Sequence, residues 1–230
     1  MEEKLFLFDI DGTLLNAHQV PRKAMRRVLL SKFHDFNYHD EYDFTGRTDW
    51  EIVEHLLEYA KVKIGNNKQL IHEIMNKYGN ELERELSNNN PPFLYPGIIE
   101  LVKHLNNTTS AYLGLVTGNV KSGAYIKLKI TGLERYFPIG AFGDEAKNRD
   151  DLPLLAIKRA EEYYQINFTR ENTWIIGDSI PDVRCAQSNN LRNLIVCTGW
   201  TSRKELERVK PEIILDNLAD TEKVLNILFN

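Results

Sequence analysis

The sequence has few cysteines, no long hydrophobic run and no excess of charge of one sign, and each shortage excludes a class of protein. Two cysteines among 230 residues are too few for a disulfide framework or a cysteine metal cage. No apolar run approaches the ~20 residues that cross a bilayer, and the opening MEEK segment is too acidic for a signal peptide. The net charge of -4 gives no electrostatic case for binding nucleic acid. We therefore expect a cytoplasmic protein with neither a membrane nor a nucleic-acid partner.

The hydrophobic residues, 42% of the chain, fall into short runs that alternate with helical patterns. This alternation is typical of an α/β fold in which helices cover both faces of a doubly wound, mostly parallel sheet. The pattern predicts strands at 4–10, 111–118, 139–142, 173–178, 193–199 and 212–218. It predicts helices between them at 122–132, 152–164, 181–189 and 220–228.

One interval breaks the alternation. Between residues 16 and 92 the pattern predicts only helices, at 21–33, 48–60 and 68–86. The run NNNPP at 88–92 then marks the return to the sheet, as a cluster of breaker residues should. We therefore predict an α/β core domain of residues 1–15 and 93–230, with an all-helical domain of residues 16–92 inserted after the first strand.

Acidic and hydroxyl side chains follow three of the predicted strands. Ligand sites of open α/β sheets lie beyond the carboxyl ends of the strands, where these side chains would gather. A turn or a helix cap explains each motif separately. Together they predict a site, because burying like charges costs several kcal/mol unless a cation neutralises them. The residues are Asp9 and Asp11 after the first strand, Thr117, Gly118 and Asn119 after the second, and Asp178 and Asp182 after the fourth.

These strand ends resemble the motifs of the haloacid dehalogenase superfamily, with DIDGTL at 9–14, TGN at 117–119 and GDSIPD at 177–182. The resemblance covers nearly the whole chain and implies a Rossmann-like core. The helical insert is identified as the α-helical cap of this superfamily. Within the insert, FTGRTD at 44–49 is similar to the cap loop of phosphoglycolate-phosphatase-like members.

One stretch departs from the family pattern. Members usually carry a lysine, often followed by proline, ahead of the helix that precedes the fourth strand. Here that stretch reads KNRDDLP at 147–153. Arg149 lies closest to the expected place, and Lys147 is the second candidate. A guanidinium can hold a carboxylate and a phosphate at once, so arginine is chemically suited to this position.

The acidic side chains favour a magnesium site. Carboxylate oxygens bind hard cations such as Mg²⁺, and no histidine or cysteine lies near the motifs to suggest zinc. The resemblance implies that the side chains of Asp9 and Asp178 and the main-chain carbonyl of Asp11 bind the ion. Asp182 would stand behind these ligands and orient a bound water.

The resemblance also implies covalent phosphoryl transfer. Asp9 would be the nucleophile that forms an aspartyl-phosphate, and Asp11 would protonate the leaving oxygen and later activate water. A carboxylate about 4 Å from a phosphate dianion is repelled by roughly 8 kcal/mol at an effective dielectric of 20, so Mg²⁺ and Arg149 are needed to offset the charge. Thr117 would bind the phosphate oxygens together with Gly12, Gly118 and Asn119.

Two further residues bear on the substrate. Dehalogenating members carry tyrosine where this chain has Asp11, so Asp11 favours phosphate esters over carbon–halogen bonds. Arg47, in the cap loop, is the candidate for contacting the end of the substrate that lacks the phosphate.

The expected function is Mg²⁺-dependent hydrolysis of a small phosphate monoester, such as phosphoglycolate, by a monomer or homodimer. A sugar phosphomutase of the β-phosphoglucomutase type is the first alternative, since it shares the cap and the aspartyl-phosphate. A phospho-receiver signalling module is a distant second. Receivers carry the phosphorylated Asp on a later strand and lack a helical insert after the first.

Overall fold

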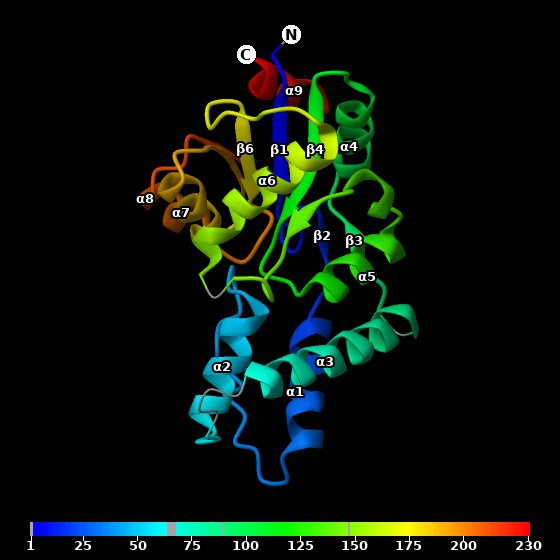
Figure 1. Ribbon diagram of the computed structural model, residues 1–230, viewed down its shortest axis with the longest axis vertical. Helices are drawn as coiled ribbons and strands as arrows, with labels where there is room; N and C mark the ends of the chain where they lie inside the picture. Colours follow the sequence, from blue (N-terminus) through cyan, green and yellow to red (C-terminus); the bar gives the residue numbers. More distant parts are fainter. Residues whose placement is uncertain (1, 64–67, 89, 147) are drawn as a thin grey trace.

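A six-stranded parallel sheet, in the order β5-β4-β1-β6-β7-β8, forms the centre of the molecule (Figure 1). The structure is a computed structural model that describes residues 2–63, 68–88, 90–146 and 148–230. In the centre of the sheet, Leu7 of β1 is paired with Gly114 of β4 on one side and Ile175 of β6 on the other. The strands are β1 (Lys4–Phe8), β4 (Ala111–Val116), β5 (Gly140–Ala141), β6 (Thr173–Gly177), β7 (Arg192–Val196) and β8 (Ile213–Leu215).

All the predicted strands are present, and each is shorter than predicted. The first, second and fourth predicted strands end before the polar residues at their carboxyl ends, such as Asp9 and Asp178. The doubly wound parallel fold predicted from the sequence is thereby confirmed.

Helices cover both faces of the sheet. Successive side chains of β1 point to opposite faces, and those on both faces are apolar. Phe6 and Phe8 pack in one hydrophobic cluster with residues of α4, α5 and α9, whereas Leu5 and Leu7 pack in another with residues of α6 and α7. The helices are α4 (Ile98–Asn107), α5 (Lys121–Thr131), α6 (Leu152–Tyr164), α7 (Ile180–Ser188), α8 (Arg203–Arg208) and α9 (Thr221–Phe229), with 3₁₀ turns at η1 (Glu134–Tyr136) and η2 (Arg149–Asp151). Helices α4 and α8 are additional to the predicted ones.

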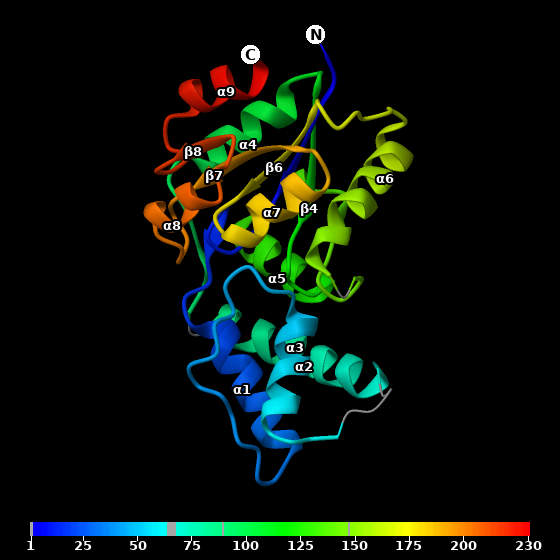
Figure 2. The ribbon, with the colours of Figure 1, turned by 90° about the vertical axis from the view of Figure 1, so that its left-hand side faces the viewer.

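The inserted cap lies beyond the carboxyl end of the sheet, opposite the two termini (Figures 1 and 2). It consists of α1 (Val20–Lys32), α2 (Asp49–Tyr59) and α3 (Lys68–Asn88), the three helices predicted there. Two short strands, β2 (Leu15–Asn16) and β3 (Phe93–Leu94), pair antiparallel where the chain enters and leaves this region. The domain limits of 1–15, 16–92 and 93–230 stay a prediction.

Helix α3 of the cap packs closely on α5 of the core because small residues lie between them. A Cβ on Gly79 of α3 would stand 2.9 Å from the Ser122 hydroxyl, and a Cβ on Gly123 of α5 would stand 3.3 Å from a methyl of Leu82. The cap therefore rests on the helix that follows β4.

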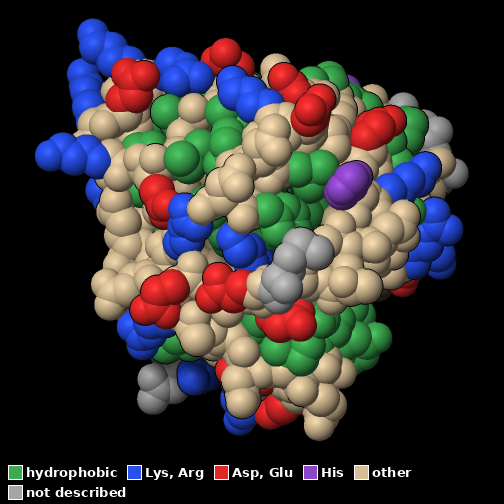
Figure 3. Space-filling model, turned by 90° about the horizontal axis from the view of Figure 1, so that it is seen from above, with side chains coloured by type: hydrophobic (Ala, Val, Ile, Leu, Met, Phe, Trp, Pro, Cys, Tyr) green, Lys and Arg blue, Asp and Glu red, His purple; other side chains and the backbone are tan. Residues whose placement is uncertain are grey.

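The face of the molecule that carries both termini shows no large region of one charge (Figure 3). From the end that carries both termini, acidic and basic side chains are interspersed with hydrophobic ones (Figure 3). Among the described residues, no helix combines the length and the hydropathy that a membrane span requires.

Candidate active site

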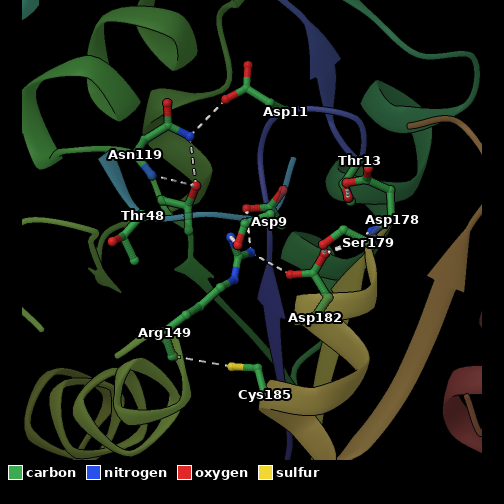
Figure 4. A network of polar contacts seen from close by, with 12 residues as sticks. Asp9, Asp11, Thr13, Thr48, Asn119, Arg149, Asp178, Ser179, Asp182 and Cys185 are labelled. Atoms are coloured by element: carbon green, nitrogen blue, oxygen red, sulfur yellow. Dashed lines mark hydrogen bonds and ion pairs between the residues drawn. The ribbon is translucent and has the colours of Figure 1, made fainter. Parts of the chain in front are cut away.

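Three buried carboxylates meet beyond the carboxyl ends of β1 and β6 (Figure 4). Asp9 directly follows β1, Asp178 directly follows β6, and Asp182 lies in the first turn of α7. One oxygen of each lies within 4.8 Å of the others, and no other such group of metal-binding side chains occurs in the described part of the chain. The structure thus brings together three acidic residues that the sequence singled out.

The surroundings of these carboxylates disfavour their charged forms. Burial raises the pKa of Asp9, and the negative charges of Asp182 and Asp11 raise it further, although Arg149 opposes them. Burial also raises the pKa of Asp178, with the charges of Asp182 and Asp9 adding to the effect. A divalent cation would remove this penalty, so the donor set and its charge fit Mg²⁺.

Asp182 is held rigidly by the start of α7. Its Oδ2 accepts hydrogen bonds from the backbone N–H groups of Asp178, at 3.1 Å, and Ser179, at 3.0 Å, and from the Ser179 hydroxyl at 2.6 Å. This capping box satisfies the amides of the N-cap residue Ser179 and of Asp178 before it. Its other oxygen is left to face Arg149.

Arg149 contacts two of the three carboxylates and the cap loop. The guanidinium donates to Oδ1 of Asp9 at 3.1 Å and also to Oδ1 of Asp182. It donates in addition to the carbonyl oxygen of Gly46, in the cap loop, at 3.0 Å. Its buried Nε has no hydrogen-bond partner among the described residues. The second candidate, Lys147, lies outside the described residues.

Lys127 is a site residue that the sequence did not predict. It lies on α5 and is 1% exposed. Its Nζ lies 2.5 Å from Oδ2 of Asp11 and 2.6 Å from Oδ1 of Asn119. The Asn119 amide donates to the same Asp11 oxygen and to the Thr117 hydroxyl, both at 2.8 Å. The feature of the sequence that could have indicated this residue is a lysine beside Leu128, within the apolar stripe of a predicted helix.

Gly12 and Thr13 hold the end of β1 against the end of β6. The Thr13 hydroxyl donates to Oδ1 of Asp178 at 3.0 Å. Gly12 has φ of +92°, and a Cβ there would stand 2.3 Å from Asp178. The Thr198 hydroxyl binds the Gly12 carbonyl at 2.5 Å. Thr13 and Thr198 extend the predicted site, and glycine is required at position 12 by both its φ and the lack of space.

The cap loop docks directly on the core. The Asp49 backbone N–H donates to the carbonyl of Gly118 at 2.7 Å, and Oδ2 of Asp49 accepts from the N–H of Val120 at 2.8 Å. Burial raises the pKa of Asp49 to about 6. Arg47 is exposed, with its Nε donating to the Asp43 carbonyl at 3.0 Å.

A pocket of about 300 Å³ lies between the cap and the carboxyl end of the sheet. Thr117 and Asp182 are not among its lining residues. The expectation that no histidine or cysteine lies near the motifs is wrong, because His18 lines the pocket and the Cys185 thiol contacts the Arg149 carbonyl. Neither belongs to the carboxylate group. The predicted residues that line the pocket are Asp9, Asp11, Gly12, Arg47, Gly118, Asn119, Arg149 and Asp178.

Comparisons with known proteins agree with this geometry. A family model described as haloacid dehalogenase-like hydrolase matches residues 6–196. A phosphorylated carbohydrates phosphatase of Thermotoga maritima is 26% identical over 93% of this chain and 97% of its own length. Pyrophosphatase PpaX of Bacillus mycoides is 22% identical over 98% of both chains. The crystal structure of CbbY from Rhodobacter sphaeroides, in complex with phosphate, superimposes with a TM-score of 0.76 at 20% identity, covering 95% of this chain and 96% of that one.

Proposed function

The chain belongs to the haloacid dehalogenase-like hydrolases, as its motifs indicated, and we propose that it is a Mg²⁺-dependent phosphatase acting on a small phosphate monoester. The observation that carries this proposal is the buried Asp9, which Arg149 contacts on one oxygen beside two further carboxylates. Two relatives named as phosphatases support it. The substrates in their names differ, so the proposal names the class of substrate, with phosphoglycolate as one candidate.

We propose that the side chains of Asp9 and Asp178 and the carbonyl of Asp11 hold the ion. The buried like charges, with pKa values raised by burial, are the feature that a cation would stabilise. When bound, Mg²⁺ supplies positive charge that offsets the repulsion between Asp9 and the phosphate. Asp182, fixed by its capping box, orients the water molecules around this position.

The chemistry proceeds in two halves. An oxygen of Asp9 attacks phosphorus, and the bond to the ester oxygen breaks while Asp11 protonates that oxygen. Water then attacks the aspartyl-phosphate, giving a proton to Asp11, and the Asp9 carboxylate is released together with inorganic phosphate. Arg149 holds Asp9, and its unpartnered Nε is a donor available to a phosphate oxygen. Thr117, Asn119 and the amides of Gly12 and Gly118 bind the remaining oxygens.

The cap selects the substrate in this proposal. Cap residues such as Phe44 and Tyr78 line the pocket together with Arg47, which contacts the part of the substrate that lacks the phosphate. Both cysteines are free thiols, in agreement with the cytoplasmic location that we propose.

The test is a panel of phosphate monoesters assayed with Mg²⁺ for release of inorganic phosphate. We expect turnover with Mg²⁺, loss of turnover with a chelator, and a short-lived phosphoprotein labelled on Asp9. Failure to release phosphate from every ester would contradict the proposal. Phosphate returned to a sugar through a bisphosphate would indicate the mutase instead, while membership of the hydrolase family already argues against a receiver module.

A further inference from the structure

Lys127 is a buried cation that binding of phosphate or metal does not explain. It lies on α5, away from the strand ends that supply the carboxylates, and its Nζ contacts Asp11 and Asn119. Burying a lone ammonium costs several kcal/mol, which a well-placed carboxylate offsets. A leucine at this place in the apolar stripe would stabilise the helix without that cost. The charge therefore calls for a reason other than packing.

Both contacts around Asp11 end on the same oxygen. Oδ2 accepts from the Lys127 ammonium at 2.5 Å and from the Asn119 amide at 2.8 Å. Among the described residues, no hydrogen bond reaches Oδ1. A carboxylate held through one oxygen by two donors cannot turn without losing both hydrogen bonds. Its free oxygen is therefore kept in one orientation in the pocket that Asp11 lines.

We propose that Lys127 is a positioning residue that fixes Oδ2 of Asp11, so that Oδ1 is the oxygen that exchanges the proton. This inference rests on the proposed phosphatase function. In the first half-reaction, Oδ1 of Asp11 gives its proton to the ester oxygen as that oxygen takes the electron pair of the breaking P–O bond. In the second, Oδ1 takes a proton from the water that attacks phosphorus. Lys127 keeps its place throughout and exchanges no group with the substrate.

Neighbouring residues hold the side chain of Lys127 in place. Its Nζ is bound on two sides, by Asp11 and by Asn119, and the Asn119 amide is in turn bound to Thr117. The charge of Lys127 also acts on Asp49 of the cap, where it counters part of the rise in pKa caused by burial. Loss of the ammonium would remove one of the two donors that hold Asp11, while leaving the contact between Asp9 and Arg149 in place.

The test replaces Lys127 with methionine, which has similar length and no charge, and compares two aryl phosphates that differ in leaving group. The leaving oxygen of phenyl phosphate needs to be protonated, whereas the p-nitrophenolate of p-nitrophenyl phosphate departs with little help from an acid. A hydrogen bond to a charged group corresponds to about 10- to 150-fold in rate. We expect Lys127→Met to lower kcat for phenyl phosphate within this range, to change kcat for p-nitrophenyl phosphate by about threefold or less, and to leave both KM values nearly unchanged.

A second measurement separates positioning from general support of the fold. Lys127→Met is added to Asp11→Asn, which has no acid left to position. We expect the second substitution to change the residual rate less than about twofold, because residues that act as a unit are not additive. Lys129→Met, two residues away on the same helix and exposed, is the matched control and should match wild type with both esters.

Equal losses with the two esters, or additive losses in the double variant, would overturn the role of Lys127. If Lys127→Met does not fold, Lys127→Gln, which keeps an N–H donor but no charge, is assayed against the same pair of esters. A wild-type enzyme that hydrolyses neither ester would instead contradict the proposed function itself. The two failures are therefore distinguishable.

Discussion

The guanidinium of Arg149 lies 3.1 Å from Oδ1 of Asp9, although 140 residues separate them in the chain. The contact engages one oxygen of Asp9. A nucleophile held in this way has one orientation, as in-line attack on phosphorus requires.

Asp9→Asn should abolish phosphatase activity and leave the fold intact. The amide has the shape of the carboxylate and can still accept the hydrogen bond from Arg149, but it cannot form an aspartyl-phosphate. Phosphate release and circular dichroism measure the two expectations. Activity retained by a folded preparation, free of wild-type enzyme, would show that Asp9 is not the nucleophile.

Calcium should bind at the carboxylates and inhibit. Ca²⁺ accepts 6–8 oxygen ligands and bidentate carboxylates, whereas Mg²⁺ requires octahedral geometry, so Ca²⁺ can take both oxygens of Asp9. We expect competitive inhibition against Mg²⁺, and a higher Tm with either ion, corresponding to about 2.7 kcal/mol at a hundred times Kd. Asp178→Asn should lose this shift. Equal turnover with both ions would mean that Asp9 is not both ligand and nucleophile.

Arg47→Ala should harm natural substrates selectively. A hydrogen bond from its guanidinium to the far end of the substrate contributes about 1.5–3 kcal/mol, equivalent to about 10- to 150-fold in kcat/KM. An artificial aryl phosphate lacks that end, so its hydrolysis should stay within a few-fold of wild type. Arg149→Ala should slow both substrates, because it contacts the shared nucleophile. Equal losses in Arg47→Ala would assign that residue to cap closure or folding.

Gly118→Ala should prevent the cap loop from packing against the core. The added methyl would stand 2.1 Å from the Arg47 carbonyl oxygen, in the cap loop, and 3.1 Å from the Arg149 guanidinium. We expect kcat/KM to fall by about tenfold or more while the Tm drops by only a few degrees. Gly132→Ala is the control, since its methyl would meet nothing within 4 Å and its φ of +74° adds only local strain. Unchanged kcat/KM in Gly118→Ala would show that the contact does not matter for turnover.

Asp49→Asn should make stability less sensitive to pH. Burial raises the pKa of Asp49 from 3.8 to about 6, so the folded state binds this proton more tightly than the unfolded state. Its contribution to the free energy of unfolding is therefore greatest below pH 4 and is lost as the pH rises toward 6. The loss is roughly 3 kcal/mol for a shift of about two pKa units.

The asparagine variant lacks this term, so it should gain up to about 3 kcal/mol relative to wild type between pH 4 and pH 8. Urea unfolding in the presence of a chelator measures the difference at each pH. Asp220→Asn is the matched control, since that exposed carboxylate also accepts a backbone N–H. A constant difference between wild type and Asp49→Asn across this range would contradict the prediction.

The strands and the acidic residues at their ends could be predicted because both depend on short-range patterns. Parallel strands end on one edge, so a motif such as Asp9 after β1 and Asp178 after β6 must converge once the sheet forms. Helix α8 could not be predicted because its six residues are too few for a periodic pattern. Helix α4 could have been, since Ile98, Leu101, Val102 and Leu105 have helical spacing and are buried.

The contacts of Lys127 and Thr13 could not be read from the sequence in the same way. They join residues 116 and 165 positions apart, respectively, and depend on how α5 and the first turn are oriented over the sheet. Arg149 was placed from the family pattern, but its simultaneous contacts with Asp9 and Asp182 required the folded loop. Side-chain positions across elements are set by packing, which a single sequence does not display.

The ladder between β2 and β3 fixes where the chain leaves the core and where it returns. Leu15 pairs with Leu94, and Asn16 with Phe93, so the two ends of the intervening segment lie one strand spacing apart, about 4.8 Å. A segment with adjacent ends can be exchanged for one of another length without moving a strand of the main sheet. One contiguous stretch of coding sequence can thus be exchanged by recombination, while the carboxylates at the ends of β1 and β6 are inherited unchanged.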